Sequence, residues 1–545
     1  MLSYGSYVAG QDRPGDAWVY TLRSSAMVRD FFGSLALKRG LEKGRIAPAD
    51  APEQVVGRCS LADGHDLDAA LAAASAAARE WRAFPLEARL RMVEEFRSLV
   101  LEHFEEIVDL MVAEGHPRTL ARWELTGWLA NTGPETRDWV RGQMEHQAVI
   151  GPRRMTIRRV ADGVVCLNPP QNASVANSML GVWALAAGNA LVVRAPVSAP
   201  LGVLHAVHRL VVPALERVGA PAGVLNAVCA DARQTLGHWL DSPLVDDIMF
   251  FGGSEKGVAF GAECVARGKK PVLELAGNDT AVVWHDADLD RAAEMLAESF
   301  YGSGQICMVP NRAVVHPRIA DRLIEKLQAK AAGIRPGFPE DEGVLLSPVL
   351  RADSYFAILE QALAGGAQLV CGGRRVDVNG EPDEIGLFLE PTVIRVDGLK
   401  AAADLDAVRH ETFFPLLPVV IPEDAPDDEL LDAVIEFTNA NAYGLRNSLW
   451  AGDPEVIDRF VGGVTNGGLL KVNDSHIGFL PLLPTHGGNG LTGGPGGEAN
   501  FPILRTSRLQ GVSVAAEGVQ PRTAAFEAAA EVVEAMKAKP KGAAA

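Results

Sequence analysis

Long hydrophobic runs and paired cysteines are both scarce in this 545-residue sequence. The most apolar stretch, SMLGVWALAAGNALVV, is interrupted by Gly188 and Asn189 before it reaches the length of a membrane span. The six cysteines include no CxxC pair, which argues against a zinc site and for a reducing compartment. The first residues lack the basic start and apolar core of a signal peptide. We therefore expect a cytoplasmic protein without a membrane partner or a metal ion.

Positive charge is also in deficit. Lys and Arg number 51 against 69 Asp and Glu, which gives a formal net charge of -18. This sign argues against nucleic acids and anionic membranes as partners, because both are polyanions. The hydrophobic fraction of 48% and the charged fraction of 22% are those of an ordinary soluble protein. The length predicts more than one domain.

The first half of the chain changes its pattern twice. About sixty residues at the start look irregular, and from Asp66 two strongly helical segments follow, DLDAALAAASAAAREWRAF and PLEARLRMVEEFRSLVLEHFEEIVDLMVAEG. RRMTIRRVADG then alternates basic and apolar residues, which predicts an edge strand or hairpin arm. After Gly163 short apolar strands such as VVCLN, ALVVRAP and PVLELAG alternate with helices. This alternation predicts an α/β fold with a doubly wound parallel sheet, which binds ligands at the carboxyl ends of its strands.

The second half repeats the α/β pattern from TAVVWHDADLD to about LLKVND. The segment THGGNGLTGGPGGEANFP predicts a glycine-rich loop, LRTSRLQGVSVA a late strand, and the Ala-rich end at most one terminal helix with a frayed end.

Three residues far apart in sequence form a coherent set for acyl chemistry. Cys307 lies in the glycine-rich polar segment GSGQICMVP, Glu274 ends an apolar strand, and Asn172 follows another strand. A thiolate attacks a carbonyl, an amide stabilises the oxyanion, and a carboxylate deprotonates water. Cys307 could instead be a packing cysteine, and Asn172 could merely cap a helix.

Five segments together resemble the aldehyde dehydrogenase superfamily over roughly residues 66 to 515. In chain order, which is also the family's order, they are NPPQNAS, FFGGSEKG, LELAGNDTAVVWHDADLD, GQIC and HETFFP. The resemblance implies an aldehyde dehydrogenase-like α/β fold with a Rossmann-type dinucleotide-binding domain (1–146 and 163–273) and a catalytic domain (274–475). It also implies a small oligomerisation sheet (147–162 and 503–515), which leaves 516–545 as a C-terminal tail. The protein would then be a homodimer or homotetramer.

The resemblance also implies roles for individual residues. Cys307 would be the nucleophile, Glu274 the base and Asn172 the oxyanion donor. The cofactor would meet Arg194, Gly252, Gly253, Gly257, Glu411 and Phe413. The two outer glycines of FFGGSEKG could only permit a tight turn, Glu411 could be a solvated acid, and Phe413 could be simple core.

Several positions depart from the family's pattern. Gln171 stands where the family usually has tryptophan, Phe414 where it has glycine, and Gly302 where it often has asparagine. Val197 replaces a glutamate that would repel a 2′-phosphate, and Arg194 has a guanidinium fork suited to a phosphate. We therefore expect either NADP or NAD as the cofactor, with a slight preference for NADP.

The sequence thus predicts a cytoplasmic, oligomeric NAD(P)-dependent enzyme that oxidises a small-molecule aldehyde to a carboxylic acid. One alternative is a CoA-acylating dehydrogenase. The loop THGGNGLTGG also weakly resembles that of aldehyde dehydrogenases that act on CoA-linked semialdehydes, so the substrate itself could be CoA-linked. Glu274 argues against CoA as the acyl acceptor, because a deacylating base is then not needed. A catalytically idle binding protein is the other alternative.

Overall fold

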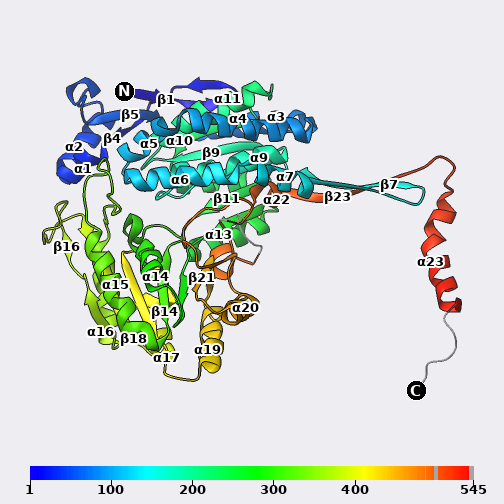
Figure 1. Ribbon diagram of the computed structural model, residues 1–545. Helices are drawn as coiled ribbons and strands as arrows, with labels where there is room; N and C mark the ends of the chain where they lie inside the picture. Colours follow the sequence, from blue (N-terminus) through cyan, green and yellow to red (C-terminus); the bar gives the residue numbers. More distant parts are fainter. Residues whose placement is uncertain (485, 496–500, 539–545) are drawn as a thin grey trace, which may run out of the picture.

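Two helix-covered sheets form the body of the molecule, and a narrow arm projects from it (Figure 1). The computed structural model describes residues 1–484, 486–495 and 501–538. The expected α/β organisation is confirmed. Parts of the predicted glycine-rich loop (485 and 496–500) and the predicted frayed end (539–545) lie outside the described residues. Among the described helices, none has the length and apolar character that crossing a membrane requires.

The N-terminal sheet has the strand order β12-β11-β8-β9-β10-β2-β3. Its first five strands are parallel, and β2 and β3 extend the β10 edge in antiparallel orientation. The strands are β2 (Ser6–Val8), β3 (Gln11–Arg13), β8 (Val164–Asn168), β9 (Ala190–Pro196), β10 (Leu225–Ala230), β11 (Asp247–Phe251) and β12 (Lys270–Glu274).

Alternate side chains of this sheet enter two different cores. In β9, Leu191 and Val193 belong to one cluster of buried residues and Ala190 and Val192 to the other. Because both faces are apolar, helices cover both faces. One face packs against α3 (Gly64–Ala83), α12 (Ala232–Asp241) and α13 (Ser254–Ala266). The other carries α4 (Leu86–Glu102), α5 (Phe104–Ala113), α6 (Arg118–Asn131), α7 (Pro134–Met144), α8 (Ser174–Ser178), α9 (Gly181–Ala187), α10 (Leu201–Ala206), η2 (Val207–Val211), α11 (Val212–Arg217) and α22 (Pro502–Arg505).

The first sixty residues are more regular than expected. They form β1 (Leu2–Tyr4), β4 (Trp18–Leu22), β5 (Val55–Ser60), α1 (Ser24–Arg29), α2 (Phe31–Glu42) and η1 (Pro48–Asp50), besides β2 and β3. The strands β1, β5 and β4 make a small sheet of their own. The second predicted helix is also divided, because α4 ends and α5 begins around His103.

The C-terminal sheet has the order β15-β18-β19-β14-β13-β21-β22, and only β15 is antiparallel to its neighbour. Its strands are β13 (Asp279–Val283), β14 (Pro310–Val315), β15 (Gln368–Cys371), β18 (Thr392–Asp397), β19 (Leu416–Ile421), β21 (Arg446–Trp450) and β22 (Leu469–Val472). One face packs against α14 (Leu289–Ala297), η3 (Glu298–Gly304), η4 (Pro317–Ile319) and α15 (Ala320–Gly333). The other carries α16 (Ala352–Ala364), α17 (Leu399–Ala403), α18 (Asp406–Arg409), α19 (Asp427–Asn439) and α20 (Pro454–Gly463). Short elements complete this half: β16 (Arg375–Val376), β17 (Phe388–Leu389), β20 (Tyr443–Gly444) and α21 (Gly490–Gly493).

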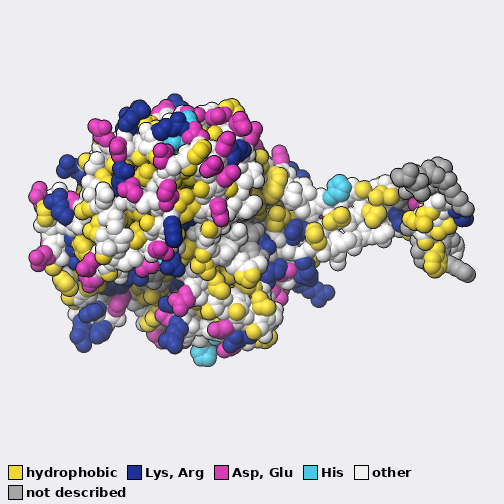
Figure 2. Space-filling view, turned by 90° about the horizontal axis from the view of Figure 1, so that it is seen from below, with side chains coloured by type: hydrophobic (Ala, Val, Ile, Leu, Met, Phe, Trp, Pro, Cys, Tyr) yellow, Lys and Arg dark blue, Asp and Glu magenta, His cyan; other side chains and the backbone are white. Residues whose placement is uncertain are grey.

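The projecting arm is an antiparallel sheet of β6 (Glu145–Ile150), β7 (Arg153–Ala161) and β23 (Ser507–Ala515) (Figure 1). It matches the predicted segments closely, except that residues 503–505 belong to α22. Hydrophobic side chains lie along its surface in Figure 2. The tail contributes α23 (Pro521–Ala538), which lies beyond the end of the arm (Figure 1).

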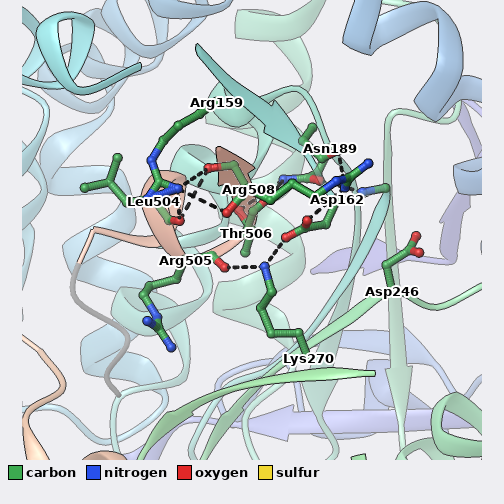
Figure 3. Close-up of polar contacts among 12 residues, drawn as sticks. Arg159, Asp162, Asn189, Asp246, Lys270, Leu504, Arg505, Thr506 and Arg508 are labelled. Atoms are coloured by element: carbon green, nitrogen blue, oxygen red, sulfur yellow. Dashed lines mark hydrogen bonds and ion pairs between the residues drawn. The ribbon is translucent and has the colours of Figure 1, made fainter. Parts of the chain in front are cut away.

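Polar contacts fix the root of the arm to the N-terminal sheet (Figure 3). Lys270 of β12 pairs with Asp162 and donates to the backbone carbonyl of Arg505 at 3.0 Å. Arg508 of β23 pairs with Asp162 from the other side at 3.1 Å. The arm is therefore joined to the body by charged groups from three different segments.

Candidate functional site

The candidate site lies where the two sheets meet. The strands β8 and β12 of the N-terminal sheet end just before Asn172 and at Glu274, and β13 of the C-terminal sheet begins five residues after Glu274. Cys307 precedes β14, whose start is paired with the start of β13. The carboxyl edge of one sheet thus adjoins the amino edge of the other, and parallel α/β sheets bind ligands at such a carboxyl edge.

The loop that carries Cys307 has an unusual backbone. Gly302, Ser303 and Gly304 all have positive φ angles, and Ser303 is held in this conformation by hydrogen bonds between its Oγ and the backbone of Ser347. A Cβ at Gly304 would lie 2.1 Å from the carbonyl oxygen of Phe414. Close backbone contacts therefore fix the loop on both sides. Such strain in a held loop is often found at functional sites.

Cys307 is half-buried among acidic groups. Burial raises the pKa of its thiol well above the usual value, and the carboxyl groups of Glu274, Glu411 and Asp279 raise it further. The guanidinium of Arg446 acts in the opposite direction. The thiol must lose its proton to become a nucleophile. The structure places Glu274 near enough to Cys307 to act electrostatically on the thiol.

Glu274 is a buried carboxyl group at the end of β12. One carboxyl oxygen, Oε2, accepts a hydrogen bond from the backbone N–H of Gly487. Burial is the largest influence on this group and raises its pKa to about 8. Its acidity therefore lies in the range that general acid–base chemistry near neutral pH requires.

Asn172 is linked to the cysteine loop and caps no helix. Its Nδ2 donates to the backbone carbonyl of Gln305 at 3.0 Å, two residues before Cys307. The helix α8 begins at Ser174, and its start has no side-chain cap. The amide has two N–H groups, so Gln305 accounts for one of them.

The glycines of FFGGSEKG form the turn from β11 into α13. Gly253 is the N-cap of α13, has no capping side chain, and a Cβ there would meet open space. Gly252 donates its N–H to the carbonyl of Glu274 at 3.1 Å. At Gly257 a Cβ would lie 2.1 Å from Leu275, so this glycine permits the helix to pack next to the Glu274 strand. An uncapped helix start in open space suits a phosphate group.

Glu411 and Phe413 lie on the loop before β19. Oε1 of Glu411 accepts a hydrogen bond from the N–H of Gly277 at 2.9 Å, and burial raises the pKa of Glu411 to about 8. Glu411 is therefore not a solvated loop acid. Phe413 has a positive φ of 61° and is half-buried. Phe414, in contrast, points into the core and meets Tyr355 edge to face.

The position of Arg194 does not fit the hypothesis that its guanidinium binds a phosphate of the cofactor. Its side chain is buried, and its guanidinium donates to Oδ1 of Asn168 at 2.6 Å and to the carbonyl of Ala230 at 3.0 Å. A third, longer bond reaches the carbonyl of Pro169 at 3.4 Å. All three guanidinium nitrogens thus bind protein oxygens. This geometry favours a structural role, in which Arg194 fixes the segment that leads to Asn172.

Apolar side chains surround the other side of Cys307. The cluster contains Met308, Val309, Leu445 and Ile477 as buried members, and Trp123, Tyr301, Ile306 and Phe479 as partly buried members. The rings of Trp123 and Phe479 stack with centroids 5.0 Å apart. Leu480, Leu482 and Leu483, which follow Phe479 in the chain, are 39 to 41% exposed. Only the three-dimensional structure identifies this wall, because its members come from four separate segments.

Three other residues of the site could not be predicted from the sequence. Arg446 is buried beside Cys307 and Glu274, and its backbone N–H donates to Asp279 at 3.1 Å. Gly487 binds Glu274, and burial beside Arg446 lowers the pKa of His486 to about 3. The glycine-rich sequence around His486 is the one available signal. It indicates an irregular loop without indicating which carboxylate that loop meets.

One group among the described residues has metal-ligand chemistry, although no metal is predicted. His285, His316 and Asp427 lie within reach of one another. Arg318, however, donates to both carboxylate oxygens of Asp427. An arginine cation therefore already neutralises this carboxylate.

Known proteins are similar to this chain in both sequence and fold. The family model described as "Aldehyde dehydrogenase family" matches residues 42–500. A vanillin dehydrogenase of Corynebacterium glutamicum is 32% identical over 80% of this chain and 87% of its own length. A succinate-semialdehyde dehydrogenase [NADP(+)] of Escherichia coli is 31% identical over 75% of this chain and 82% of its own. A solved structure of an NADP-dependent enzyme from E. coli superimposes with a TM-score of 0.76 at 25% identity, covering 94% of this chain and 98% of that one.

These matches agree with the geometry of the site, in which a thiol, a buried carboxyl group and an amide are gathered at the junction of two α/β sheets. The chain belongs to the aldehyde dehydrogenase family and is an NAD(P)-dependent enzyme that oxidises aldehydes to carboxylic acids.

Proposed function

We propose that Cys307, Glu274 and Asn172 carry the reaction as nucleophile, general base and oxyanion donor. The observation that supports this most strongly is the link between Asn172 and the cysteine loop, at 3.0 Å from Nδ2 to the carbonyl of Gln305. Glu274 is the third member of this set, because its carboxyl group acts electrostatically on the Cys307 thiol. An amide, a thiol and a carboxyl group at one edge match the needs of acyl transfer.

The steps follow from these groups. The Cys307 thiol loses its proton to solvent, and the sulfur of the thiolate attacks the aldehyde carbon. Asn172 stabilises the oxyanion of the resulting thiohemiacetal. When bound, the nicotinamide cofactor supplies the hydride acceptor, and the loss of hydride leaves a thioester on Cys307. Glu274 then removes a proton from water, the water oxygen attacks the thioester, and the carboxylic acid and the free thiol are released.

The N-terminal sheet would hold the dinucleotide. The start of α13 at Gly253 would receive the pyrophosphate, beside Gly252 and Gly257, while Glu411 and Phe413 would hold the nicotinamide half. Arg194 would support this region from inside the sheet. Val197 presents no carboxylate, so we propose a slight preference for NADP, which kcat/KM measured with each cofactor would test.

The apolar wall beside Cys307 favours an uncharged, preferably aromatic, aldehyde. The stacked pair of Trp123 and Phe479 offers π-faces, against which an aromatic ring packs well. The 32% identical relative is named for vanillin, an aromatic aldehyde. We expect kcat/KM for benzaldehyde to exceed that for succinic semialdehyde by at least about tenfold. The reverse order would favour a charged or CoA-linked substrate.

The protein would work as a homodimer or homotetramer in the cytoplasm, with the arm as the contact between copies. The N-terminal sheet would form the dinucleotide-binding domain and the C-terminal sheet the catalytic domain. Six free cysteines fit a reducing compartment. Water, rather than CoA, would accept the acyl group, because Glu274 lies at the thiol.

Substitution of Cys307 tests the catalytic assignment. Cys307→Ala should lower benzaldehyde oxidation to background while leaving the affinity for NADP and the thermal unfolding midpoint unchanged. Cys371→Ala is the matched control, because Cys371 is the other half-buried cysteine. Substantial turnover by Cys307→Ala, with loss of activity in the control, would overturn the assignment.

A further inference from the structure

A histidine outside the predicted set holds the backbone of Asn172 from behind. His116 lies just after α5, and its Nε2 is 3.0 Å from the carbonyl oxygen of Asn172. Through Asn172 it is connected to Gln305 and the cysteine loop. The position of the amide therefore depends on contacts at both the backbone and the side chain of Asn172.

Both ring nitrogens of His116 face oxygen acceptors. Nδ1 is 3.3 Å from the carbonyl of Met111, and Nε2 faces Oε1 of Glu124 at 3.6 Å besides Asn172. A neutral imidazole has one N–H, so one nitrogen would direct its lone pair at an oxygen. Since a carbonyl oxygen only accepts, Nε2 carries the N–H that the carbonyl of Asn172 receives.

The ring of His116 is held against a buried carboxyl group. Oε1 of Glu124 in α6 lies 3.6 Å from Nε2, and Glu124 is 8% exposed. Burial raises the pKa of Glu124, and the nearby His116 acts in the opposite direction. On the segment that carries His116, the carboxyl group of Glu114 accepts the N–H groups of Leu201 and Gly202 at the start of α10, which fixes the backbone before the histidine.

We propose that His116 is the positioning residue for the oxyanion donor Asn172. This inference rests on the proposed role of Asn172. The hydrogen bond from Nε2–H fixes the carbonyl of Asn172, and this keeps the side-chain amide in the orientation that the oxyanion requires. Met111 and Glu124 hold the imidazole ring in place for this contact.

A double-mutant cycle tests the proposal. The measured quantity is the rate of the first turnover of NADPH formation, at saturating NADP with benzaldehyde as substrate. We expect His116→Ala and Asn172→Ala each to lower this rate, His116→Ala by about ten- to a hundredfold, because a misplaced group can cost that much. If His116 acts through Asn172, the double variant should be no slower than Asn172→Ala within about twofold.

Two further variants separate positioning from simple structural support. His116→Gln keeps an N–H donor and should recover most of the rate, whereas His116→Leu has no donor and should recover little. His65→Ala is the matched control, because His65 is exposed. The affinity for NADP and the unfolding midpoint should stay unchanged in His116→Gln, which keeps the proposal testable if His116→Ala is unstable.

Each outcome has a distinct meaning. Multiplied losses in the double variant, a wild-type rate in His116→Ala, or equal rates for the glutamine and leucine variants would overturn the role of His116. A wild-type rate in Asn172→Ala would instead overturn the proposed function itself, and the role of His116 would fall with it.

Discussion

At the scale of single residues, Gly277 connects Glu411, on the proposed cofactor side of the site, to the proposed nucleophile. Its N–H donates to Glu411, and a Cβ at its position would lie 2.0 Å from the backbone oxygen of Cys307. A backbone atom cannot move aside as freely as the end of a flexible side chain. A methyl group here would therefore displace the cysteine itself.

We expect Gly277→Ala to lower kcat/KM for benzaldehyde by at least about a hundredfold, since small displacements of reacting groups have effects of this size. Gly237→Ala is the control, because Gly237 lies within α12 and a Cβ there meets open space. That substitution should stabilise the helix by about 1 kcal/mol and leave kcat/KM unchanged. Equal activity of the two variants would contradict the close contact.

The sequence offers a local signal for the proposed reacting groups but none for the groups that hold them. Cys307 and Glu274 could be proposed because a polar glycine-rich loop and a carboxylate at a strand end are unusual settings. His116 and Gly487 carry no such local signal, since their partners lie 56 and 213 positions away. Arg194 has the right chemistry for a phosphate, but burial directs its guanidinium to Asn168 and Ala230.

At the scale of elements, long strands and helices with a clear apolar period could be predicted, whereas short ones could not. β1, β2 and β3 have three residues each and depend on pairing with distant strands, such as β2 with β10. A run of three residues shows no period. The break between α4 and α5 leaves no mark in the sequence, because the apolar pattern continues across His103.

The arm is the element from which we predict how copies of the protein assemble. Leu509 of β23 pairs with Arg159 of β7, so Leu509, Ile157 and Met155 lie on the same face of the arm. These three hydrophobic side chains are 65, 54 and 38% exposed. A contiguous exposed apolar face of this kind marks an interaction surface.

We expect Ile157→Arg to reduce the molecular mass in solution from that of a dimer or tetramer toward that of the monomer, measured by light scattering after gel filtration. A charge buried in an apolar contact without a partner is costly. Leu101→Arg on α4 is the control, because Leu101 is 55% exposed away from the arm. A wild-type protein that already elutes as a monomer would refute the role of the arm.

At the scale of the whole molecule, the chemistry depends on two sheets that meet edge to edge. Asn172 comes from the N-terminal sheet and Gln305 from the C-terminal half, 133 positions apart, and a single hydrogen bond joins them. The family match covers residues 42–500 and therefore both sheets. Under the proposed assignment, the N-terminal sheet ends in the base and the oxyanion donor, and the C-terminal sheet presents the nucleophile.

Because acylation of Cys307 precedes hydrolysis of the thioester, the proposed role of Glu274 in hydrolysis can be tested separately. Glu274 has a pKa raised to about 8, so its carboxylate, the form that acts as a base, increases as the pH rises through that value. Release of the acyl group should accelerate over the same range. A glutamine at this position has no carboxylate at any pH, so it should leave the acyl group on the sulfur.

Intact-protein mass spectrometry of Glu274→Gln, mixed with benzaldehyde and NADP at pH 9, measures this directly. We predict a benzoyl adduct on the variant that maps to Cys307 and persists, whereas wild-type protein at the same pH returns to its original mass after turnover. Loss of the general base should slow turnover by about a hundred- to ten-thousandfold. Undiminished turnover by the variant, or an adduct that forms on another residue, would contradict the account.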